Sequence, residues 1–60
     1  MRLPAWHAAH AEVQGHMALA RGQAPDLARA RFAAAAAGFR DAGHALDATR
    51  CADKLAALRR

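Results

Sequence analysis

Hydrophobic residues recur every three or four positions along most of this chain, which is the period of an amphipathic α-helix. The first segment with this period is predicted to be helical over residues 4–21, because Pro4 suits a first helical turn and Gly22 suits a helix end. Leucine, tryptophan, valine and methionine form its apolar seam, at Leu3, Trp6, Val13 and Met17. The polar residue His10 lies in the gap between Trp6 and Val13. This heptad-like seam predicts that one face of the helix packs on another element.

The second predicted helix covers residues 25–42, with Pro25 at its first position and Gly43 after its end. Phe32 and Phe39 lie seven residues apart, so they share a helical face and are predicted to be packed. Gly38 lies inside this segment, where it costs about 1 kcal/mol relative to alanine, so we interpret it as a point of close contact with another backbone.

The third predicted helix covers residues 45–58. Its apolar stripe is formed by Ala48, Cys51, Leu55 and Leu58. No segment alternates with a period of two, and β-branched residues are almost absent, so strands are not expected. The short connections predict an all-α domain over residues 1–60, an antiparallel helical hairpin plus a third helix.

A chain of 60 residues buries a small core, and its single cysteine cannot form an internal disulfide bond. We therefore expect it to associate with a protein partner, or with copies of itself as a dimer or bundle. Candidate interface or core residues are Leu3, Trp6, His10, Val13, Met17, Phe32, Phe39, Leu55 and Leu58. The sequence does not separate those in the monomer core from those at the interface.

Nine Lys and Arg residues face five Asp and Glu residues, giving a formal net charge of +4 with the two signs interspersed. Asp26 precedes Arg29, and Asp47 precedes Arg50, by three residues, which predicts ion pairs on solvated helix faces. An alternative function is nucleic-acid binding, in which basic side chains contact phosphates. The residues concerned would be Arg29, Arg31, Arg40, Arg59 and Arg60.

Several stretches resemble a tetratricopeptide-type helix pair, and in particular the terminal repeat of helical arrays in large bacterial regulators of the LuxR/MalT type. The stretches are LARG at 19–22, DLARARF at 26–32, AAGFRDAG at 36–43, LDATRC at 46–51 and LAAL at 55–58. The resemblance implies that Gly15 lets the second helix pack closely on the first and that Gly22 closes the first helix. It also matches Ala30 to a small residue of the second helix, and Phe32 or Phe39 to the aromatic that follows. It implies a role in bacterial regulation or scaffolding.

His7 and His10 are three residues apart and share a helical face, a spacing that can supply two ligands of a zinc site. A metal site would need a further ligand such as His16, His44 or Cys51, so a histidine-based metal module is a second alternative function. We expect Cys51 to be a buried small hydrophobic residue, because no histidine is placed to activate it.

The expected class is a non-enzymatic interaction module without a cofactor, because no paired acid, base and nucleophile and no glycine-rich phosphate loop are present. A single cysteine, and the lack of a long apolar run, predict a cytoplasmic protein that does not enter a membrane.

Overall fold

The computed structural model describes residues 5–58, which form three α-helices joined by short connections. These are α1 (Ala5–Ala20), α2 (Pro25–Asp41) and α3 (Ala45–Leu58). The predicted all-α class is confirmed, and the predicted boundaries that fall within residues 5–58 agree with the structure to within one residue. The predicted first residue of the first helix, Pro4, lies outside the described residues, as do Leu3, Arg59 and Arg60.

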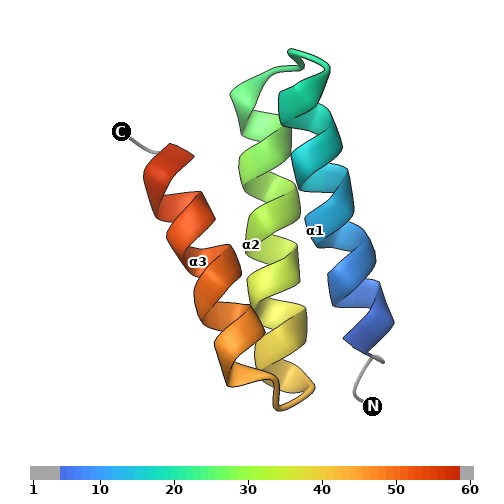
Figure 1. Ribbon diagram of the computed structural model, residues 1–60, viewed down its shortest axis with the longest axis vertical. Helices are drawn as coiled ribbons and strands as arrows, with labels where there is room; N and C mark the ends of the chain where they lie inside the picture. The colour runs from blue at the N-terminus through green and yellow to red at the C-terminus, as the bar shows by residue number, and fades with distance from the viewer. Residues whose placement is uncertain (1–4, 59–60) are drawn as a thin grey trace.

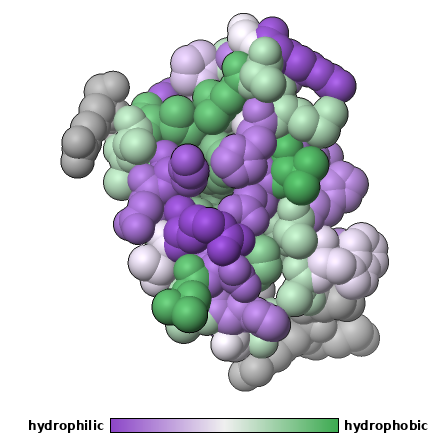
Figure 2. All heavy atoms as spheres, viewed as in Figure 1, coloured by the Kyte–Doolittle hydropathy of each residue, from purple (hydrophilic) through white to green (hydrophobic). Residues whose placement is uncertain are grey.

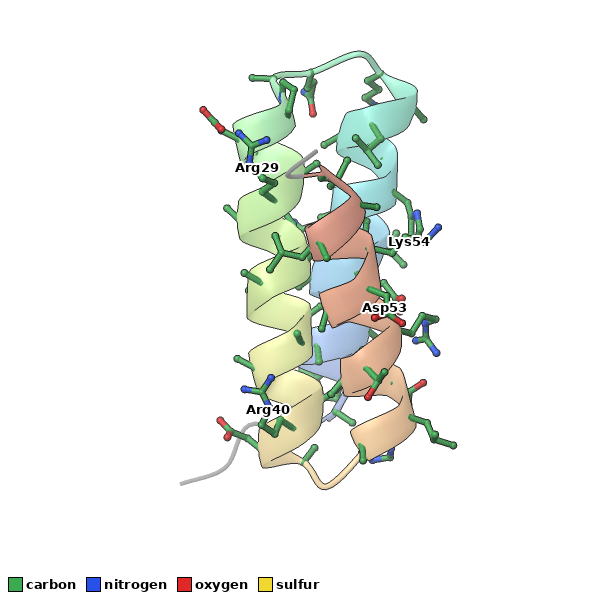
Figure 3. All side chains as sticks on the ribbon, turned by 90° about the vertical axis from the view of Figure 1, so that its left-hand side faces the viewer. Arg29, Arg40, Asp53 and Lys54 are labelled. Atoms are coloured by element: carbon green, nitrogen blue, oxygen red, sulfur yellow. The ribbon has the colours of Figure 1, made fainter. Side chains whose placement is uncertain are left out.

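The chain runs along α1, returns along α2 and reverses again along α3, so that successive helices are antiparallel (Figure 1). In Figure 1, α2 lies between the other two helices; after a 90° turn, in Figure 3, it lies to one side of both. Both α1 and α3 therefore pack on α2, which is the central element of the fold. The Cα trace measures 33 × 19 × 14 Å.

Each helix connection contains a glycine in a left-handed conformation as its second residue, at φ +68° for Gly22 and +81° for Gly43. After α1, the amides of Gly22 and Gln23 donate hydrogen bonds to the carbonyls of Leu19 and Ala18. The equivalent amides after α2 donate to carbonyls near the end of that helix. This double hydrogen bond is the Schellman motif, and it reverses the chain within a few residues.

The core consists of two clusters, and each contains one phenylalanine of α2. Phe39 lies in the cluster nearer the α2–α3 connection, and Phe32 lies in the cluster nearer the α1–α2 connection. The other buried members are small: Ala8, Ala18, Ala28, Ala35, Ala36, Ala48 and Cys51. Leu55 and Leu58 of α3 are partly buried and cover the Phe32 cluster. Truncation of either phenylalanine to alanine is expected to cost about 3–5 kcal/mol.

The helices α1 and α2 approach one another closely at two glycines. A Cβ atom placed on Gly15 would lie 2.9 Å from Cζ of Phe32, and one placed on Gly38 would lie 2.9 Å from Cβ of Ala8. The face of α1 that contacts α2 therefore consists of small residues, Ala8, Gly15 and Ala18. The interpretation of Gly38 as a point of close contact is confirmed, and Gly15 is a second such point.

The contact between Gly15 and the Phe32 ring generates a prediction about stability. The substitution Gly15→Ala improves helix propensity by about 1 kcal/mol, yet it places a methyl group against three atoms of the buried ring. We expect the overpacking to dominate and to lower the free energy of unfolding by about 1–3 kcal/mol in chemical denaturation. In a Phe32→Leu background, where the ring is absent, the same substitution should be neutral or stabilising. A Gly15→Ala variant more stable than the parent would contradict the packing described here.

Candidate interaction surface

Three large apolar side chains of α1 lie on its solvent-exposed side, opposite the face that packs on α2. Trp6 is 62% exposed, Val13 54% and Met17 42%, and His10 is also exposed. With 3.6 residues per turn, these four positions share one side of the helix, and the small buried residues occupy the other. We call Trp6, His10, Val13 and Met17 the α1 stripe. It contains the apolar seam that the sequence pattern predicts, and within residues 5–58 no other helix covers it.

The predicted interface or core residues separate into three groups in the structure. Phe32 and Phe39 are core residues, with 0% and 5% exposure, and Leu55 and Leu58 are half-buried at the edge of the core. The α1 stripe is exposed. Leu3 lies outside the described residues.

A groove of about 290 Å³ runs beside the α1 stripe, between α1 and the start of α2. Its apolar lining comes from Met17, Ala18 and Leu27, and its charged lining from Arg21 and Arg31. His10, Gln14 and Gln23 complete the lining, which includes no Asp or Glu. We call this the arginine groove. Its volume suits one or two large side chains and lies just below the range of small-molecule sites, ~300–1,000 Å³. Sequence spacing did not indicate it, because its residues come from two helices and their connection.

An ion-pair network links α1 to α3 on another side of α1. The Arg50 guanidinium donates two hydrogen bonds of 2.8 Å to the Glu12 carboxylate and one of 2.6 Å to Asp47. Arg50 also lies over the Phe39 ring, 5.9 Å from its centre. The pairing of Asp47 with Arg50 is confirmed, as is that of Asp26 with Arg29. The pairing of Glu12 with Arg50 was not predicted, because 38 residues separate the two side chains.

The pKa values of Glu12 and Cys51, which lie at this network, are shifted in opposite directions. Hydrogen bonding to Arg50 lowers the pKa of Glu12, a side chain that is only 14% exposed. Burial, followed by the neighbouring Glu12 carboxylate, raises the pKa of the Cys51 thiol to about 11. Cys51 is fully buried, so it stays protonated at neutral pH and packs as a small apolar side chain, as predicted.

Three of the four histidines lie near an aromatic ring, and the fourth lines the arginine groove. His7 stacks on Trp6 with ring centres 3.8 Å apart, and His16 meets the edge of Phe32 at 5.1 Å. His44 lies 6.3 Å from the Phe39 ring, and His10 lines the arginine groove. Within residues 5–58, no three His, Cys, Asp or Glu side chains gather closely enough to hold a metal ion. The geometry therefore offers no support for a metal module built from His7 and His10.

The arginines proposed for phosphate contacts are dispersed. Arg29 is held by Asp26 and donates a 3.1 Å hydrogen bond to the carbonyl of Leu58, which joins α2 to the end of α3. Arg40 lies near the other end of α2 (Figure 3).

On the face shown in Figure 2, hydrophilic residues cross the middle of the molecule, with more hydrophobic residues nearer the α1–α2 connection. Within residues 5–58, every helix is too short or too polar to cross a lipid bilayer.

The Glu12–Arg50 ion pair generates a prediction about pH. Because the pKa of Glu12 is lowered on folding, its carboxylate stabilises the fold above the ordinary pKa of a glutamate. That stabilisation is lost as the pH falls through the lowered value. We expect Glu12→Gln to lower the melting temperature by about 4 °C at pH 7, with the difference from the parent shrinking in strong acid.

The matched control for this prediction is Asp53→Asn, which alters an exposed carboxylate on α3 (Figure 3). Calorimetry of the parent and both variants at a series of pH values provides the measurement. If the two substitutions lowered the melting temperature equally at pH 7, the ion pair of Glu12 with Arg50 would stabilise the fold no more than an exposed carboxylate does.

Comparison with known proteins finds no family model, no curated protein and no solved structure that matches this chain.

Proposed function

We propose that this chain is a protein–protein interaction module whose binding surface is the α1 stripe. One observation carries the proposal: α1 packs on α2 through alanines and a glycine, while Trp6, Val13 and Met17 face solvent. Exposing large apolar side chains in a row on one helix face costs free energy in water. Contiguous exposed apolar surface of this kind marks interaction sites in small proteins.

The composition of the α1 stripe suits an interface. Tryptophan is enriched among the residues that contribute most to binding, and methionine adapts to irregular partner surfaces. Trp6 is held against His7 by ring stacking, so part of its conformational freedom is already lost before binding. The spacing of the stripe, at positions i, i+4, i+7 and i+11, is the spacing with which one helix packs on another.

The close contact of Gly15 with Phe32 supports the role that the tetratricopeptide resemblance implies for that glycine. We therefore keep as part of the proposal a tetratricopeptide-like helix pair that serves bacterial regulation or scaffolding. A reducing, cytoplasmic location suits the free thiol of Cys51. Self-assembly would use the same surface, with the α1 stripe of one copy covering that of another.

Photo-crosslinking tests the proposal in cells that make the protein. A photoreactive residue replaces Val13 in the α1 stripe, or Leu46 as the control, which is 88% exposed on α3 and outside the stripe. We expect a discrete protein adduct from position 13, which mass spectrometry would identify as a second copy or another protein. Position 46 should give no such adduct, since it lies away from the binding surface.

A second variant establishes that the adduct depends on the α1 stripe itself. Trp6→Ser/Met17→Ser should abolish the adduct from position 13 yet retain the helical circular dichroism spectrum, because both side chains are exposed. Equal crosslinking from positions 13 and 46, or no adduct from position 13, would contradict the proposed function.

A further inference from the structure

We infer that the α1 stripe and the arginine groove together bind an acidic amphipathic helix of a different protein; this inference rests on the proposed function and specifies the partner. The two features are continuous, because His10 and Met17 belong to the α1 stripe and also line the groove. A helix lying along α1 would place apolar side chains over the stripe. Its flanking side chains would then face Arg21 and Arg31.

The charge of the groove selects the charge of the partner. Arg21 and Arg31 are both exposed, and neither forms an ion pair within residues 5–58. This distinguishes them from Arg29 and Arg50, which are occupied by Asp26, Glu12 and Asp47. With no carboxylate in the groove lining, the complementary charge has to come from the ligand.

The same charges disfavour a second copy of this chain as the occupant. Each copy has a formal net charge of +4, and Glu12, the acidic residue of α1, is engaged by Arg50 of α3. A second α1 stripe would therefore bring no free carboxylate to Arg21 and Arg31. The apolar lining from Met17 and Leu27 favours a peptide over a nucleic-acid backbone, since phosphates offer nothing to cover these side chains.

Two synthetic helical peptides of about 16 residues, roughly the length of α1, test the inference. Both contain leucine at i, i+4, i+7 and i+11, and the flanking positions are glutamate in one peptide and lysine in the other. Fluorescence anisotropy of the labelled peptides measures binding to the full chain. We expect the glutamate peptide to bind about fivefold to tenfold more tightly than the lysine peptide, with the preference decreasing as salt is added.

The double variant Arg21→Glu/Arg31→Glu should invert this preference. Its matched control is Arg40→Glu/Lys54→Glu, which makes the same change of charge at two side chains that point outward elsewhere on α2 and α3 (Figure 3). The control should keep the preference of the parent for the glutamate peptide. Circular dichroism of both variants confirms that they remain folded.

The emission of Trp6, the single tryptophan of the chain, locates the bound peptide. Binding along the α1 stripe should shift the emission to shorter wavelength as water leaves the indole. Equal affinity for the two peptides, a preference for lysine, or displacement of the glutamate peptide by a duplex oligonucleotide would overturn the inference. A protein adduct from position 13 combined with no charge preference would leave the proposed function standing and would reject only the acidic partner.

Discussion

The close approach of α1 to α2 at Gly15 and Phe32 is the constraint on which the remaining structure depends. The Phe32 ring occupies the space that a side chain at Gly15 would need, and Ala8 meets Gly38 in the same way nearer the other end of the helix pair. Only small residues of α1 can approach α2 this closely, so the face of α1 that contains them turns inward. In a helix of 3.6 residues per turn, the opposite face then has to turn outward, and it is the face that contains Trp6, Val13 and Met17.

This division of α1 connects stability to function. The core obtains its large buried rings from α2 alone, and α3 is fastened to both other helices by polar contacts, Arg50 to Glu12 and Arg29 to the carbonyl of Leu58. None of the bulky side chains of the α1 stripe belongs to the buried core, and their exposed surfaces remain available to a partner. The groove beside them adds positive charge that the chain does not neutralise.

The sequence was sufficient to predict the three helices, because the glycines and prolines at their ends act locally, and to place Phe32 and Phe39 on one packed face. It also predicted the seam of Trp6, Val13 and Met17, but periodicity could not show whether this seam faces the core or solvent. That choice depends on the contacts of Gly15 and Gly38 with distant residues. The Glu12–Arg50 pair and the arginine groove were missed for the same reason, since tertiary packing alone brings their residues together.

The accessibility of Trp6 in the monomer tests the central claim most directly. The chain contains one tryptophan and no tyrosine, so its emission reports on this side chain alone. In a dilute sample shown to be monomeric by light scattering, we expect emission near the wavelength of a hydrated indole and ready quenching by acrylamide, because Trp6 is 62% exposed. A folded monomer with blue-shifted emission and strong protection from acrylamide would show that α1 turns its bulky face into the core, and would contradict this account.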